Sequence, residues 1–305
     1  MVDHKKLHAL ITLLDDPDKE VVDIVEDQIL QSGDEFADPL EEVWLSGQYG
    51  ERLNKRIAEV LKKIQQNQLK KDLTDWMSSD HPDPMQGWVL ASRIQYPNFD
   101  MGLVKAHISR LKIDAWVKLS GILNPIDKIK TLNHVFFEVY GFQGNSDNYH
   151  SPDNSIITRV LETKKGNPIS LSILYMFVAQ ELGMPVFGIN LPQHFVLGYC
   201  KLHNESQFVE NLKREDLKLD HIERVMFYIN PFSKGQVFTE ESVDAFLKVI
   251  GVEPKSSFYN PCESIEIFKR ILRNMHFAYS EQQNLDKQKE VEEIMRFIGQ
   301  TRDEE

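Results

Sequence analysis

The chain has 305 residues, 41% of them hydrophobic and 27% charged, which is typical of a soluble globular protein with material for one large or two ordinary domains. A formal net charge of −12 argues against a nucleic-acid partner or an anionic membrane, because both require a basic surface. The two cysteines, Cys200 and Cys262, are too few for a disulfide framework and lack metal-ligand spacing. We therefore expect no metal site and no cofactor.

The N-terminal segment carries Asp3 and only a short apolar run, residues 7–14, so it does not resemble a signal peptide. No run approaches the roughly 18 apolar residues of a membrane-spanning helix. We expect a cytoplasmic protein.

Residues 1 to about 145 carry helical patterns throughout. The first three apolar stripes lie within residues 7–14, 21–30 and 36–44, and Asp-Pro turns occur at Pro17 and Pro82. The phrase LLDDPDKEVVDIVEDQIL resembles a HEAT-type helical repeat, and an irregular helical bundle is the alternative. Two further patterns, one with Trp88 and one running from Leu103 to Trp116, predict helices whose aromatic residues lie in the core. Residues 142–153 read as a loop.

The central stretch predicts a buried helix over residues 168–182. One face carries the i, i+3, i+4, i+7 series, and apolar residues also fill the opposite side, which is typical of a helix buried all round. Asn167 is a good N-cap, and Pro168 fits the first helical position. Gly183 ends the helix, and Pro185 prevents its continuation.

After this helix the chain predicts an antiparallel sheet. Runs rich in β-forming residues cover residues 186–191, 195–200 and 226–229, with a further strand beginning at Phe208-Val209. Thr239 caps a helix that Gly251 ends. Two helices, over residues 267–280 and 285–299, close the chain and resemble a tetratricopeptide-like hairpin, which requires the core for stability.

The motifs GNPISLSILY, LPQHFVL and INPF, in this order, resemble the transglutaminase-like superfamily and, within it, the SirB-type branch. The resemblance implies an α+β fold with a papain-like core, in which a central helix packs on an antiparallel sheet. We expect an all-helical domain over residues 1–145, the transglutaminase-like core over 146–255, and a helical hairpin over 256–305 packed on that core.

The resemblance also implies where an active site would lie. The nucleophilic cysteine of active members, two residues after Gly166, is replaced by Pro168, and the aspartate of the triad is replaced by Asn230. The family histidine corresponds to His194, and the match implies that it faces the start of the central helix. Ser170 and Ser172 could in principle substitute for the nucleophile, and Ser170, in the first turn of the helix, is the candidate that we pair with His194. Asn167 and Gln193 flank these candidates.

Two hypotheses follow from these replacements. The first is a non-catalytic interaction or regulatory protein that binds an unidentified protein partner, and the absence of a nucleophile at Pro168 favours it. The alternative is a peptidase-like hydrolase or acyl-transferase that uses Ser170 and His194. A serine nucleophile requires an adjacent base, so the hydrogen bonds of Ser170 distinguish the two.

Overall fold

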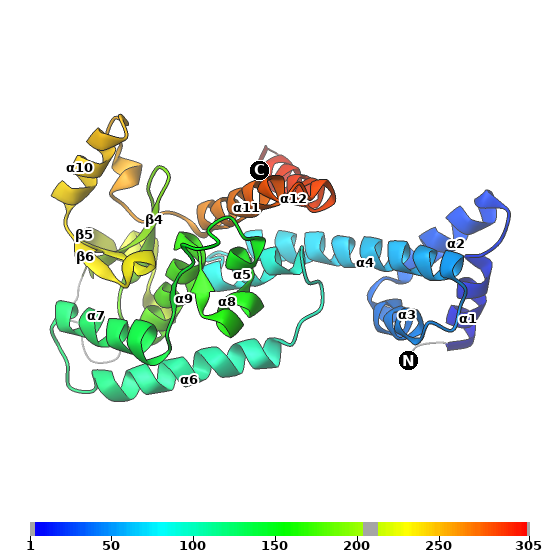
Figure 1. Cartoon of the computed structure of the whole chain (residues 1–305), viewed down its shortest axis with the longest axis horizontal. Helices are drawn as coiled ribbons and strands as arrows, with labels where there is room; N and C mark the ends of the chain where they lie inside the picture. The colour runs from blue at the N-terminus through cyan, green and yellow to red at the C-terminus, as the bar shows by residue number, and fades with distance from the viewer. Residues whose placement is uncertain (1–3, 204–212, 304–305) are drawn as a thin grey trace. The chain divides into compact units, whose positions relative to one another are not determined.

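The computed structural model describes residues 4–203 and 213–303, and the chain forms two compact units, Met1–Asp75 and Trp76–Glu305 (Figure 1). The domain boundaries expected near residues 145 and 255 both fall inside the second unit and stay predictions. The strand expected to begin at Phe208-Val209 lies outside the described residues.

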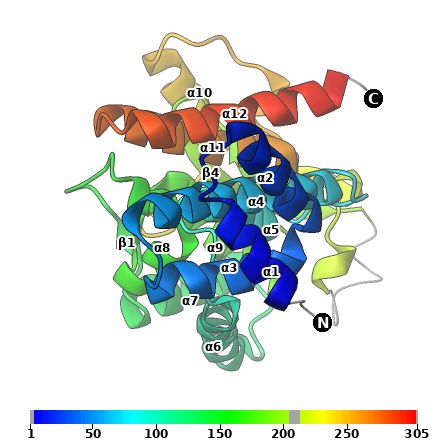
Figure 2. The same cartoon turned by 90° about the vertical axis from the view of Figure 1, so that its right-hand side faces the viewer.

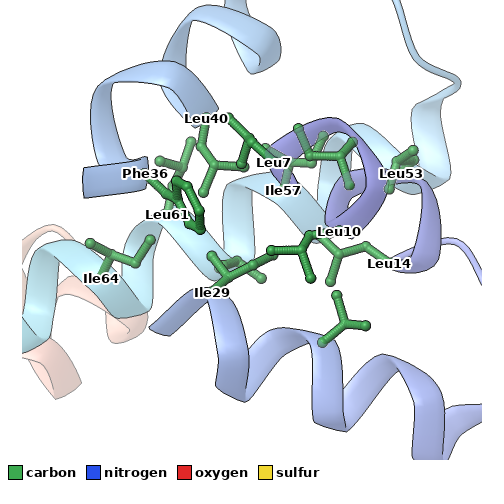
Figure 3. Packing of buried hydrophobic residues seen from close by; sticks show 13 residues of the cluster. Leu7, Leu10, Leu14, Ile29, Phe36, Leu40, Leu53, Ile57, Leu61 and Ile64 are labelled. Carbon is green, nitrogen blue, oxygen red and sulfur yellow. The ribbon is translucent and has the colours of Figure 1, made fainter. Parts of the chain in front are cut away.

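The first unit is helical, as predicted. It contains α1 (His4–Leu13), α2 (Lys19–Ser32), α3 (Asp34–Ser46) and most of α4 (Glu51–Met77). Figure 3 shows their apolar stripes packed into one cluster of buried residues, which includes Leu10, Ile29, Phe36, Leu40, Ile57 and Leu61. Burial of these side chains stabilises the unit. Its resemblance to a HEAT repeat stays a prediction.

Turn residues set the helix ends in this unit. The Asp18 side chain accepts a hydrogen bond from the Glu20 amide and so caps α2. Gly33, which separates α2 from α3, has a φ of +36° that favours glycine. Its N–H donates to the carbonyls of Ile29 and Leu30, which satisfies the end of α2.

The second unit begins with three helices that start at acidic or amide caps. These helices are α5 (Pro84–Arg93), α6 (Met101–Leu119) and α7 (Pro125–Asn133), followed by a π-helical turn η1 (His134–Val139). Asp83, Asp100 and Asn124 each accept a hydrogen bond from a first-turn amide. Trp88 of α5 is fully buried, as predicted, and its indole N–H donates to the Ser155 carbonyl at 2.6 Å.

Two predictions for this region are wrong. A two-residue strand, β1 (Gln143–Gly144), precedes the core and pairs in parallel with β2 (Lys165–Gly166), although only helices were expected up to residue 145. Trp116 was expected in the core, but 66% of it is exposed. The buried face of α6 is instead formed by Val104, Ile108, Leu111 and Ala115.

The predicted central helix is α9 (Pro168–Glu181), which follows η2 (Pro152–Ser155) and the short helix α8 (Ile157–Thr163). Twelve of its fourteen residues are buried, so it is apolar and enclosed all round, as its pattern indicates. Gly183, with a φ of +70°, follows it, as predicted for a helix end.

The predicted antiparallel sheet packs against α9. Its strands, in the spatial order β3-β4-β5-β6, are β3 (Val186–Asn190), β4 (Phe195–Leu202), β5 (Ile222–Asn230) and β6 (Gln236–Phe238). The sheet and its covering helices form the expected α+β fold. β6 is a strand that the sequence patterns did not predict.

Both faces of the sheet are covered. Ile189, Val196 and Tyr228 share a buried cluster with Val243 and Leu247 of α10 (Glu240–Val249). Because side chains alternate along a strand, their neighbours in sequence point to the opposite face, where α9 contacts β3 and β4. α9 and α10 therefore lie on opposite sides of the strands (Figure 1).

The chain ends in the two predicted helices, α11 (Ser264–Glu281) and α12 (Leu285–Asp303), which pack against one another. α11 packs on α5, and the Tyr279 hydroxyl of α11 donates to Gln95 at 2.8 Å. Their tetratricopeptide-like character stays a prediction. No helix in the described ranges combines the length and apolar character needed to cross a membrane.

Candidate functional site

The start of α9 holds three of the expected site residues in a capping network. The Asn167 side chain accepts from the Ser170 amide at 2.9 Å, and the Ser170 hydroxyl accepts from the Asn167 amide at 3.0 Å. The same hydroxyl donates to the Asn167 carbonyl at 3.2 Å. Pro168 occupies the first helical position, where it has no N–H to leave unsatisfied. This reciprocal arrangement is a capping box.

Burial reinforces the structural role of Ser170. The residue is 1% exposed, and a Cβ placed on Gly166 would lie 2.6 Å from its hydroxyl oxygen. The Asn167 amide group also donates to the Ser155 hydroxyl at 2.9 Å, which fixes the cap from a second element. The hydroxyl of Ser170 is therefore engaged with the backbone and enclosed.

His194 lies in the turn between β3 and β4. Gln193 has a φ of +60°, a left-handed conformation that turns the chain just before His194. The His194 ring is exposed on one side and lies against Phe246 of α10, with ring centroids 4.9 Å apart. This ring contact is thus with α10, across the sheet from α9.

The surroundings of His194 disfavour its charged form. Partial desolvation of the ring is the main cause that lowers its pKa, and the positive charge of Arg270 lowers the pKa further. Within the described residues no hydrogen bond reaches the imidazole. A catalytic histidine would instead need a partner that orients the ring.

Asn230 ends β5 and serves the backbone. Its side-chain oxygen accepts from the Ser233 amide at 3.3 Å and caps the 3-10 turn η6 (Pro231–Ser233). The strand register, in which Leu197 pairs with Ile229, brings Asn230 and the β3–β4 turn to the same end of the sheet. Among the described residues, no hydrogen bond joins Ser170, His194 or Asn230 to another of the three.

Arg270, on α11, is a neighbour of His194 that the sequence patterns did not identify. Its Nη1 donates to the Asn190 side chain at 3.3 Å and to the Leu191 carbonyl at 3.4 Å. Partial burial and the nearby Arg273 lower its pKa. A single arginine in a long helix carries no sequence signal for such a position, because the turn that it contacts lies about 80 residues away in the chain.

The outer face of α6 is a second feature that the patterns misassigned. Leu103, Ile113, Trp116 and Val117 are 60%, 59%, 66% and 61% exposed. The signal in the sequence is that apolar residues occur on two opposite sides of α6, which is more than one buried face requires.

The described residues offer no arrangement that supports metal binding or a reactive thiol. In the ranges 4–203 and 213–303, no three His, Cys, Asp or Glu side chains are grouped so that they could hold a metal ion. Burial raises the pKa of the Cys200 thiol to about 12, so this cysteine is protonated and unreactive at neutral pH.

Comparison with known proteins agrees with this architecture. The family model described as the transglutaminase-like superfamily matches residues 103–273. A UPF0162 protein of Xylella fastidiosa is 29% identical over 203 residues, which cover 65% of this chain and 66% of that relative, slightly under two thirds of its length. Protein SirB1 of Salmonella typhimurium is 21% identical over 68% of this chain and 71% of its own length.

A third relative is much longer. F-box only protein 21 of Homo sapiens is 27% identical over 147 residues, which are 48% of this chain but only 21% of that protein. No solved structure matches the chain. The family match covers more than half of the sequence, including α6, α9, the sheet and most of α11. The chain therefore belongs to the transglutaminase-like superfamily, and its relatives are those of the SirB-type branch.

Proposed function

We propose that this chain is a non-catalytic interaction module, whose transglutaminase-like core presents the outer face of α6 to an acidic helical segment of a partner protein. The observation that carries the proposal is the exposure of four large apolar side chains, Leu103, Ile113, Trp116 and Val117, on one helix. Several large apolar side chains exposed on one helix are typical of a protein-binding site. α6 lies at the outer edge of the second unit in both Figure 1 and Figure 2.

The spacing of this face fits a helical partner. Leu103, Ala106, Arg110, Ile113 and Val117 follow the series i, i+3, i+7, i+10, i+14, which is the seam of a heptad pattern. All five are exposed, while the buried face of α6 lies on the other side of the helix. A partner helix can place its own apolar residues between these positions, as amphipathic helices do in groove recognition.

The charges on α6 favour an acidic partner over a second copy of this chain. The exposed charged residues of α6 are Lys105, Arg110 and Lys118, all of them cationic. The single acid of the helix, Asp114, is half-buried and accepts from the Tyr140 hydroxyl at 2.6 Å. Two copies of α6 would repel each other, whereas carboxylates on a partner would pair with these cations.

The absence of a catalytic arrangement among the described residues supports the same proposal. The hydroxyl of Ser170 is used in the capping box, and Pro168 cannot act as a nucleophile. No observation favours the alternative hydrolase or acyl-transferase. A segment similar to 48% of this chain makes up 21% of F-box only protein 21, which is compatible with a role as one module of a larger protein.

The experiment is selection of binding peptides from a displayed library of random helical sequences, with the intact chain as bait. We expect enriched peptides to carry Asp or Glu beside apolar residues at heptad spacing. Ile113→Glu, within the seam, and Trp116→Glu, beside it, should each weaken binding by about tenfold or more, since an anchor residue contributes about 2 kcal/mol. Val249→Glu is the matched control, because Val249 is 85% exposed on α10, away from the stripe.

Three outcomes would contradict the proposal. One is enrichment without acidic residues, and another is binding that Trp116→Glu leaves unchanged. The third is a different occupant for the face. Trp116-dependent binding to vesicles of phosphatidylglycerol would assign it to a membrane surface, and Trp116-dependent dimerisation in sedimentation would assign it to a second copy.

A further inference from the structure

The guanidinium of Arg270 is anchored at one edge and unpaired at the other. Nη1 makes both of its hydrogen bonds, to the Asn190 side chain and the Leu191 carbonyl. Within the described residues, Nε and Nη2 have no hydrogen-bond acceptor, and Arg270 forms no ion pair. This free Nε–Nη2 edge is the one that binds the two oxygens of a carboxylate in parallel.

A second arginine adds positive charge near that edge. Arg273 lies one turn along α11 and is close enough to lower the pKa of Arg270. His194 lies close enough for Arg270 to lower its pKa in turn. No carboxylate of the described residues forms an ion pair with Arg270, although the whole chain has 47 acidic and 35 basic residues. A half-buried cation that has no anionic partner among the described residues is costly, so an external anion would stabilise it.

Aromatic rings border the same face of α11. Phe277 follows Arg270 and Arg273 in the series i, i+3, i+7, and it is 50% exposed. The His150 ring packs against Phe277 at a centroid distance of 5.1 Å. Its neighbour Tyr149 is close enough to interact electrostatically with Arg270. An anion bound at Arg270 would thus have apolar ring surface beside it.

We infer that Arg270 and Arg273 form a binding site for a carboxylate attached to an apolar or aromatic group. Arg270 holds the two oxygens through Nε and Nη2, Arg273 adds charge, and the rings of Tyr149 and Phe277 contact the apolar part. A free small acid and the carboxylate of a peptide share this chemistry. The site is formed by α11, the β3–β4 turn and the loop before η2, so it is independent of the binding face of α6.

The test uses two ligands with the intact protein, followed through the arginine Nε–H resonances by NMR. Phenylacetate represents a small acid, and the amide of N-acetyl-Phe-Asp-Phe represents a peptide carboxylate. We expect at least one of them to shift the Arg270 resonance saturably. Phenylacetamide, which has the same ring but no charge, should bind at least about tenfold more weakly, because a charge-assisted bidentate pair is roughly twice as strong as a neutral one.

Three variants complete the test. Arg270→Lys retains the charge but loses the bidentate edge, and Arg273→Gln removes a charge from an exposed residue. Both should weaken ligand binding, the first by about tenfold. Arg296→Gln, at an exposed arginine of α12, is the control and should have no effect. Tighter binding of the peptide would identify a protein ligand, and tighter binding of phenylacetate a small molecule.

The inference is overturned if neither ligand shifts the Arg270 resonance, or if Arg270→Lys and Arg273→Gln bind as well as the unmodified protein. Unchanged spectra elsewhere show that each variant is folded. Trp116→Glu should leave this binding intact, so failure here and failure of the α6 proposal are distinguishable.

Discussion

Ser170→Ala tests whether this serine caps the helix or serves catalysis. The substitution removes a hydroxyl that accepts from the Asn167 amide at 3.0 Å and donates to the Asn167 carbonyl at 3.2 Å. Each bond contributes about 1 kcal/mol net, so the expected loss is about 2 kcal/mol. The Asn167 amide would keep only a long contact, 3.5 Å, to the Asn154 carbonyl, which places the cost in the upper part of a range of about 1–3 kcal/mol.

The chain provides a matched control in Ser172. This serine is also fully buried in α9, but its hydroxyl has no hydrogen-bond partner among the described residues. Ser172→Ala therefore removes a buried, unsatisfied group and should be neutral or stabilising. The two substitutions delete the same atom from the same helix, and only one deletes hydrogen bonds.

The assay is urea denaturation followed by circular dichroism and tryptophan fluorescence. The change in the free energy of unfolding is calculated from the shift of the denaturation midpoint, provided that the dependence of that free energy on urea concentration is unchanged. Ser170→Ala should also lower the melting temperature by roughly 4–8 °C, since about 1 kcal/mol corresponds to 2–4 °C in a unit of this size. A Ser170→Ala protein as stable as Ser172→Ala would refute the capping role and make Ser170 available for chemistry.

Three further predictions concern the core, the site and a turn. Leu174→Ala should destabilise the protein by about 2–5 kcal/mol, measured by the same denaturation, because Leu174 is 1% exposed in α9. Arg270→Gln should raise the pKa of His194, because the substitution removes a positive neighbour that disfavours the imidazolium. The pKa is measured by following the imidazole proton shift against pH, and an unchanged pKa would mean that desolvation acts alone. Gly235→Ala should cost more stability than Gly121→Ala, since both have positive φ but only the first would place a Cβ directly against an asparagine side chain of α7. Equal costs would contradict this close approach at Gly235.

Local signals predicted the central part of the fold well. The cap at Asn167, the proline at the first helical position and the glycine after the helix gave both ends of α9 correctly. Such signals work because capping and punctuation depend on a few neighbouring residues. The strands β3 and β4 were found for a similar reason, since buried strands read as continuous apolar runs. Of β5, only the part with the buried residues 227–229 was predicted, and its more exposed first half was missed.

Features that depend on distant contacts were missed. β1 and β2 have only two residues each, and they pair in parallel across about 20 residues of intervening chain. No local sequence pattern predicts such a pairing. β6 likewise owes its extension to pairing with β5. Trp116 was assigned to the core because hydrophobicity alone does not tell which of two apolar faces of α6 is covered. The resemblance gave candidate positions at Pro168, His194 and Asn230, but the contacts that these residues make could be read only from the structure.

The central proposal is that the transglutaminase-like core of this chain has no catalytic activity. The most direct measurement is a turnover assay on ester, amide and glutamine-donor substrates, with the unmodified protein beside Ser170→Ala and His194→Ala. We predict no turnover above background in any of the three, because the resemblance places Pro168 at the position of the nucleophile and the Ser170 hydroxyl is hydrogen-bonded within the helix cap. Turnover by the unmodified protein that is lost in both variants, while folding is retained, would contradict the claim and establish a serine-dependent enzyme.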